Sequence, residues 1–192
     1  MDHPGLRGLW PEYLVVQHQI IRATVPLTRV ALERANALGD DPAGLAGYLE
    51  LHVDEELGHD ETLLEDLALL GLDREHVLGR MPSPAVASLV GAQYYWILHH
   101  HPVAFLGYVG VMEGYPPTEE LVELLVERTG FSREAFRTFS EHGELDPGHR
   151  DHLDRTLDAL PLTERHEQVI GSSAVATVAL ATQAVEEVLA RR

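Results

Sequence analysis

The sequence predicts an all-α protein, a single-domain helical bundle of about seven helices over residues 1–192. Apolar residues recur at helical spacing along most of the chain, and no strand-type alternation or Asn-Gly hairpin signal of any weight interrupts them. Glycine and proline fall where helices would end or restart. A chain of this length can bury one full core, so we expect one domain.

The first half of the chain predicts two long helices. The first runs from residue 10 to about residue 38, and Pro26 should kink it without ending it, because the apolar pattern continues past the proline. Asp41 and Pro42 suit the N-cap and the first turn of the second helix, which should continue to Leu70. Residues 73–82 are expected to form a connector.

The second half predicts a buried central helix and three further ones. Residues 85–112 are hydrophobic nearly all round, with a break at Pro102, so this stretch, including Tyr95, should lie in the core. Thr118 should cap a short amphipathic helix. A helix with the second histidine run described below follows, and a long helix closes the chain from Thr163.

Composition excludes several classes of partner and chemistry. The formal net charge of −17 argues against nucleic acid and anionic membranes as partners. Because the chain has no cysteine, disulfides, thiolate nucleophiles and iron–sulfur clusters are excluded, and a cytoplasmic location fits. No export signal is recognised at the N-terminus. Polar residues dilute the apolar stretch 169–189, which favours a buried helix over a membrane span and suggests a homodimer contact.

Two runs of the chain each carry a histidine, an acid four residues later and a second histidine three residues after the acid. The runs are His52, Glu56 and His59, and His142, Asp146 and His149. On a helix such offsets fall within roughly 60° of one another, so each run can point two imidazoles and a carboxylate in one direction. One match would suggest a solvated helix face, whereas two matches on separate helices favour a site for iron, manganese or zinc.

Glu113 adds a carboxylate at the end of the apolar stretch, where it either reaches solvent or joins the site. Three carboxylates and three imidazoles on three helices suit two metals that share a bridging carboxylate. Oxygen chemistry would favour iron, and zinc hydrolysis stays open. Pro147 and Gly148 lie inside the second run, so this segment should be weakly helical unless a metal ties it down.

These motifs resemble the haem-oxygenase-like diiron oxidases and oxygenases, a family of iron-containing redox enzymes. The resemblance is carried by the tryptophan-led first helix, the run 55–60 followed by Asp66-Leu67, the stretch 102–107 leading into Met112-Glu113-Gly114, and His142-x3-Asp146-x2-His149. It implies a haem-oxygenase-like fold with two iron ions, and O2 as co-substrate. The implied ligands are Glu56, His59, Glu113, His142, Asp146 and His149, of which the carboxylates Glu56, Glu113 and Asp146 would be catalytic.

The resemblance also implies a small-molecule substrate. It would be oxidised by N-oxygenation of an amine or by oxidative C–C cleavage of an amino- or fatty-acid-like molecule. The alternative is a metal-binding or haem-binding protein of the same fold without O2 turnover, with His18 as the residue to compare with a haem ligand.

Other residues near the motifs are expected to play smaller parts. His52 could be a metal ligand, but we favour a role in which it supports the ligands or caps a helix. Glu55 should be a surface acid or a supporting acid. At most one residue of the run 99–101 can face a given site, because consecutive helical residues point about 100° apart. His76, His152 and His166 should be surface residues.

Overall fold

The computed structural model describes residues 5–39 and 44–190, and over these residues it is helical without strands. The all-α prediction is therefore confirmed. The elements are α1 (Leu6–Leu38), α2 (Leu45–Glu56), α3 (His59–Leu69), α4 (Arg74–Gly79), α5 (Pro84–His99), η1 (Pro102–Ala104), α6 (Phe105–Met112), α7 (Glu119–Thr129), η2 (Arg133–Phe136), α8 (Arg137–Ala159) and α9 (Glu164–Leu189).

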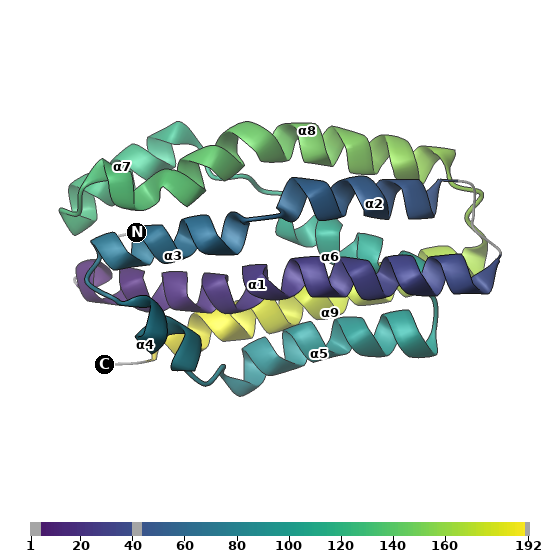
Figure 1. Cartoon of the computed structure of the whole chain (residues 1–192), viewed down its shortest axis with the longest axis horizontal. Coiled ribbons are helices and arrows are strands. Elements are labelled where there is room, and N and C mark those ends of the chain that lie inside the picture. The colour runs from purple at the N-terminus through teal and green to yellow at the C-terminus, as the bar shows by residue number, and fades with distance from the viewer. Residues whose placement is uncertain (1–4, 40–43, 191–192) are drawn as a thin grey trace.

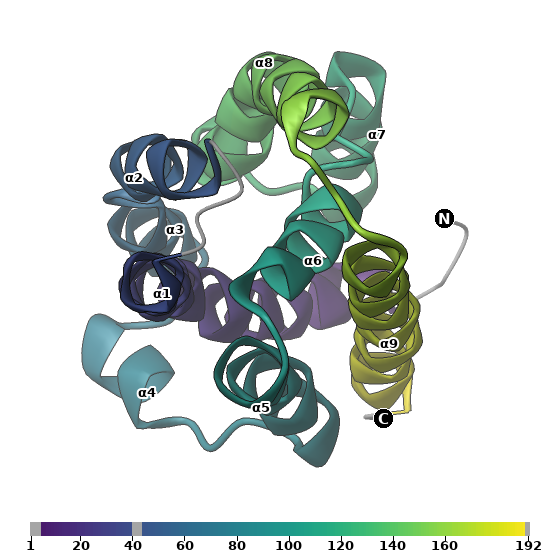
Figure 2. The ribbon, with the colours of Figure 1, turned by 90° about the vertical axis from the view of Figure 1, so that its right-hand side faces the viewer.

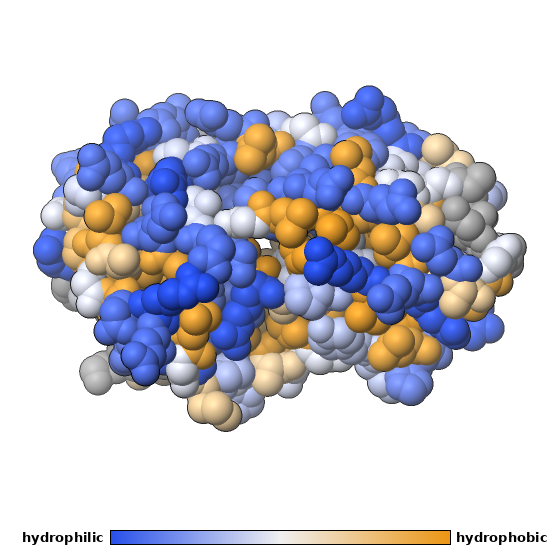
Figure 3. All heavy atoms as spheres, in the orientation of Figure 1, coloured by the Kyte–Doolittle hydropathy of each residue, from blue (hydrophilic) through white to orange (hydrophobic). Residues whose placement is uncertain are grey.

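The long helix α1 runs the length of the bundle. It continues through both Pro11 and Pro26, as the uninterrupted apolar pattern predicts. In Figure 1, α5 and α9 lie on one side of α1, while α2, α3 and α8 lie on the other. Figure 2 looks along the bundle and shows the short helix α6 enclosed among α5, α8 and α9. Hydrophilic side chains cover most of the face in Figure 3, with apolar patches between them.

The centre of the bundle is α6, which the sequence predicts as a buried element. A Cβ atom added to Gly107 would lie 2.2 Å from the backbone oxygen of Ile170, so α6 and α9 approach more closely than any side chain at this position allows. Residue 113 is the C-cap of α6 and is buried, so the end of this helix delivers a carboxylate to the interior and not to solvent.

The predicted second helix is wrong in one respect, because it breaks at Leu57 and Gly58. Leu57 is extended and Gly58 has φ 93°, a left-handed conformation that favours glycine. Glu56 therefore ends α2, and His59 begins α3. The predicted start at Asp41 and Pro42 lies outside the described residues.

Two further predictions need correction. The stretch 73–82 contains α4, whose N-cap Asp73 accepts a hydrogen bond from the backbone N–H of His76. Tyr95 is 55% exposed on α5 rather than part of the core. The cap Thr118 is confirmed, since its side chain accepts a backbone hydrogen bond in the first turn of its helix. The last helix begins next to Thr163 as predicted, and the side chain of Thr163 also caps it.

The apolar interior consists of two clusters. The first joins side chains of α1, α2, α5, α6 and α9, and the second joins the start of α1 to α3, α7 and η2. We call them the main cluster and the end cluster. In the described residues α9 is the one helix long and apolar enough to cross a membrane by length and composition. It packs on α5 and α6 with one face but leaves Val175 and Val178 exposed, so the expectation of a buried helix holds for that face alone.

Candidate metal centre

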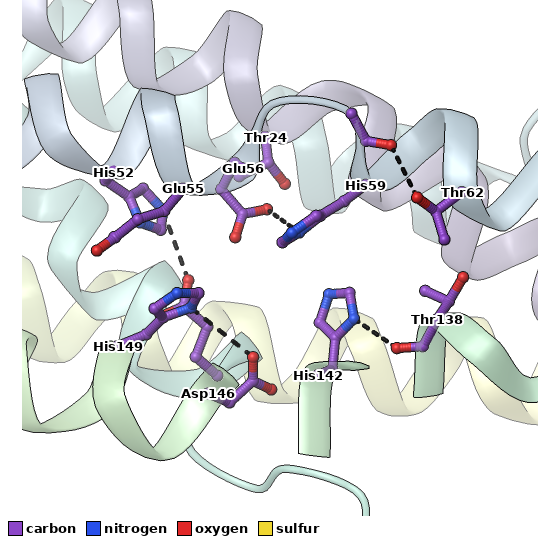
Figure 4. A network of polar contacts seen from close by, with 12 residues as sticks. Thr24, His52, Glu55, Glu56, His59, Thr62, Thr138, His142, Asp146 and His149 are labelled. Carbon is purple, nitrogen blue, oxygen red and sulfur yellow. Dashed lines mark hydrogen bonds and ion pairs between the residues drawn. The ribbon is translucent and has the colours of Figure 1, made fainter. Parts of the chain in front are cut away.

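Histidines and carboxylates from four helices converge between α2, α3, α6 and α8. In Figure 4 the side chains of α2 and α3 point across a gap toward those of α8. The residues that line this gap in the view are His52, Glu55, Glu56, His59, His142, Asp146 and His149. Glu113 joins them from the end of α6, with Oε1 3.5 Å from His52 Nε2. The structure thus brings together all six residues proposed as ligands, and adds His52.

The tightest group is His52, Glu56 and Glu113, whose potential ligand atoms lie within 4.8 Å of one another. All three residues are buried. We expected His52 to support the ligands and not to be one of them. Its ring is fully buried and stacks on Tyr48, with the ring centres 5.6 Å apart. Its Nε2 faces a carboxylate from α6, which the sequence could not place opposite it.

The remaining candidates lie around this group. His59 Nδ1 is 3.5 Å from Glu56 Oε2, so the break between α2 and α3 keeps these two residues together. The rings of His59 and His142 are 4.8 Å apart between centres. On α8, His149 Nδ1 lies 3.9 Å from Asp146 Oδ1, and the helix is continuous through Pro147, so all three α8 candidates share a face as their spacing predicts.

The orientation of His142 is fixed by a short relay of hydrogen bonds. Its Nδ1 donates to the backbone oxygen of Thr138 at 2.7 Å, since a carbonyl can only accept. The backbone N–H of Thr138 in turn donates to the carboxylate of Asp66 on α3 at 2.8 Å. With Nδ1 carrying the proton, Nε2 keeps the lone pair that a metal ligand needs.

Several buried polar atoms of the centre have no hydrogen-bond partner among the described residues. They are both ring nitrogens of His52, Nδ1 of His59, Nδ1 of His149 and Oε2 of Glu113. A buried polar atom left unpaired costs about 1–3 kcal/mol. Nitrogen and oxygen donors that converge without partners fit a divalent cation such as iron or zinc, which would satisfy them together.

The raised pKa values of two carboxylates also indicate a cation site. Burial raises the pKa of Glu113 to about 9, and the negative charges of Glu56, Asp146 and Glu55 add to the effect. Burial, helped by the charge of Glu56, raises the pKa of Asp146 to about 6, although His142 and His59 lower it. Carboxylates that lie close together in a buried site favour each other's protonated forms, unless a bound cation takes the place of the protons.

A small inner cavity of about 90 Å³ adjoins the tightest group. Its walls include His52, Glu56, Glu113 and His142, together with Gln17 and Thr24 from α1. We missed these α1 residues because nothing in their local sequence marks them.

Two other residues beside the metal centre were also not predicted, although the sequence contained a signal for each. Tyr48 stacks on His52 from one helical turn earlier, and Asp66 holds Thr138 from a position already noted in the resemblance. His152, expected at the surface, is half-buried with its ring 5.0 Å from that of Tyr48.

The remaining predictions concern side chains around the centre. Glu55 lies beside His52, with Oε2 3.7 Å from Nδ1. His18 is buried but does not line the inner cavity. The histidines of residues 99–101 belong elsewhere, since His100 and His101 line a pocket between α5 and α9 with His166.

Comparison with known proteins agrees with this fold. A family model described as iron-containing redox enzyme matches residues 25–182. No curated protein matches the chain. A domain of unknown function with a haem-oxygenase-like fold from Shewanella denitrificans aligns with a TM-score of 0.83 and 19% identity, over 98% of this chain and 84% of that one.

A CADD-like protein of unknown function from Nostoc punctiforme aligns in two crystal structures. The TM-scores are 0.72 and 0.65 at 20% and 21% identity, over 95% and 93% of this chain and 81% and 79% of the other. At these identities the likeness shows the fold alone. The predicted haem-oxygenase-like fold is thereby confirmed.

Proposed function

Because the chain belongs to the family of iron-containing redox enzymes, we propose that it is a non-haem diiron oxidase or oxygenase that uses O2 to oxidise a small organic molecule. The observation that carries the proposal is the buried group of His52, Glu56 and Glu113, with unpaired donor atoms facing the histidines and acid of α8. A mixed nitrogen and oxygen donor set without sulfur suits iron that reacts with oxygen.

Two iron ions would be held by the six residues first proposed, with His52 as a seventh. The proposed set is Glu56, His59, Glu113, His142, Asp146 and His149. When bound, the iron supplies the O2 activation and electron transfer. Glu113 would contribute a carboxylate ligand from the end of α6, close to His52 of α2.

The protein's own residues would position these groups and limit access of water. The backbone oxygen of Thr138 would orient the ring of His142 by the hydrogen bond that it accepts, and Glu55 would contribute a negative charge beside His52. Tyr48 and Tyr108 form part of the apolar wall, and burial raises the pKa of both phenols, so they stay protonated and neutral. An inner cavity of about 90 Å³ leaves room for small reactants beside the ligands and little bulk water.

The alternative is a metal-binding or haem-binding protein without turnover. The cavity volume counts against haem, because a porphyrin is far larger than about 90 Å³ and His18 does not face that cavity. A zinc hydrolase would use the same donor types. Oxygen consumption after iron loading separates these functions.

The decisive experiment is anaerobic loading with Fe(II), followed by elemental analysis and Mössbauer spectroscopy. We expect about two irons per chain in a coupled, carboxylate-bridged state, and O2 consumption when air is admitted. Asp146→Ala should lose one metal and all turnover, whereas His166→Ala at the start of α9 should keep both. Two metals bound normally by Asp146→Ala would contradict the assignment. One iron, none, or tight zinc instead would remove the diiron proposal.

A further inference from the structure

Three cavities adjoin at Gln17 of α1 and Met112 of α6. Both residues line the inner cavity, and both line two outer pockets. The first outer pocket, of about 250 Å³, lies between α1, α7 and α8, and the second, of about 430 Å³, lies between α1, α6 and α9. Tyr115 borders both and is 90% exposed, so both open toward the surface at one place. Gln17 and Met112 therefore lie at the boundary between the inner cavity and both outer pockets.

The walls of the first outer pocket are mostly apolar and aromatic. They include Tyr13, Ile21, Leu63, Tyr115 and Phe139. Its one acidic residue is Asp146, at the end next to the metal centre. This lining is that of a site for the apolar part of a small molecule.

Over residues 5–39 and 44–190, no lysine or arginine lines any of the three cavities. The charged residues in their walls are acids, with Glu186 in the second outer pocket and Glu56 and Glu113 in the inner cavity. A carboxylate moved from water into such a pocket would lose hydration without gaining a cationic partner. The outer pockets therefore favour a molecule whose outer end is uncharged.

The charge balance at the centre disfavours an acid at the inner end too. Four carboxylates gather there, from Glu55, Glu56, Glu113 and Asp146. Two divalent cations would just offset them, so a further carboxylate would leave the centre with a net negative charge. An amine would be favoured at the same place, because carboxylate oxygens accept hydrogen bonds from its N–H groups.

Gln17 offers a neutral partner at the junction. Its amide carries one acceptor and two donors, and it makes no hydrogen bond with the described residues. Met112 faces the same junction with an unbranched, flexible side chain that can move aside as a molecule passes.

We propose that the substrate is a small amine with an uncharged apolar chain or ring, and that Gln17 is the specificity-determining residue that receives the amine group. The apolar part would occupy an outer pocket while the nitrogen lies toward the inner cavity. This inference rests on the proposed function, since it names the substrate class of the same site. It separates amines from the amino- and fatty-acid-like molecules that the sequence left open.

Calorimetry with the zinc-loaded protein tests this without turnover, because zinc accepts the same ligands but has no redox chemistry. The probes are 2-phenylethylamine, 3-phenylpropanoate and L-phenylalanine, which share a ring and differ in charge. We expect the amine to bind at least tenfold more tightly than either carboxylate. Equal or tighter binding of 3-phenylpropanoate, or no binding of the amine, would overturn the proposal.

Charge substitution at the junction gives a second test. Gln17→Arg should weaken 2-phenylethylamine at least tenfold and strengthen 3-phenylpropanoate. Met112→Lys should do the same from the other element, which guards against a folding defect in one variant. The matched control is Gln183→Arg on the exposed face of α9, which makes the same charge change outside the three cavities. An equal effect of the control would overturn the role of Gln17.

The two proposals can fail separately. Loss of the diiron assignment would show as absent iron or absent O2 consumption, whatever the probes do. If iron loads and O2 is consumed but carboxylates bind best, the diiron function stands and the amine inference falls. The calorimetry is repeated on metal-free protein, so a failure to load zinc still leaves the preference between the probes measurable.

Discussion

Replacement of Glu113 by glutamine should stabilise the metal-free protein at neutral pH. Burial and neighbouring acids raise the pKa of Glu113 to about 9, so at pH 7 it is protonated in the folded state, whereas in the unfolded chain it ionises near its ordinary value of 4.5. The unfolded state therefore gains free energy from ionisation that the folded state lacks. Glutamine has nearly the same shape and cannot ionise in either state.

The magnitude follows from the distance between the solution pH and 4.5. At pH 7 that distance is 2.5 units, and at about 1.4 kcal/mol per unit the free energy of unfolding should rise by about 3 kcal/mol in Glu113→Gln. At pH 5 the gain should fall to about 1 kcal/mol or less, because this pH lies only slightly above the ordinary value of 4.5. The sign is that of a raised carboxyl pKa, so wild-type stability falls as pH rises from about 4.5 to 9 through this group.

The assay is urea denaturation of metal-free protein in the presence of a chelator, at pH 5, 6, 7 and 8. Glu123→Gln on the exposed face of α7 is the matched control and should change little at any pH. A gain of the same size at pH 5 and pH 7, or a loss of stability at pH 7, would refute the reasoning. With metal bound the order should reverse, because an amide is a poorer ligand than a carboxylate.

Three further predictions concern the metal, α8 and α9. Metal uptake should release protons and tighten as pH rises toward about 9, because Glu113 and Asp146 must lose their protons; calorimetry in buffers of different ionisation enthalpy measures this, and equal affinity at pH 6 and 8.5 would contradict it. Hydrogen exchange across residues 139–152 should be faster without metal, since Pro147 weakens α8, and equal strong protection in both states would count against metal-dependent order. If the exposed apolar face of α9 joins two copies, Val178→Asp should shift sedimentation from dimer to monomer, and a wild-type monomer at every concentration would rule the contact out.

The fold class and the two histidine runs could be predicted because both depend on local spacing. A period of 3.6 residues identifies helices and also places residues at offsets of four and seven on one face, so α8 presents His142, Asp146 and His149 together. The cap Thr118 was also predictable, since its side chain acts within one turn.

Features that depend on tertiary packing could not be predicted in this way. Glu113 could equally have reached solvent, and only the burial of α6 brings it within 3.5 Å of His52. The break after Glu56 was missed because a single glycine is tolerated inside many helices, and the left-handed φ of Gly58 is decided by how α2 and α3 pack on α1. The exposure of Tyr95 likewise depends on which face of α5 meets α9.

The candidate centre lies where the main cluster and the end cluster adjoin. His52 and Glu56 come from α2, which belongs to the main cluster, while His59 begins α3, which belongs to the end cluster. Polar residues at this junction contribute few hydrophobic contacts between the main cluster and the end cluster. Bound cations would therefore couple them, so the loaded protein should melt in one cooperative transition, and the metal-free protein should lose its end cluster first.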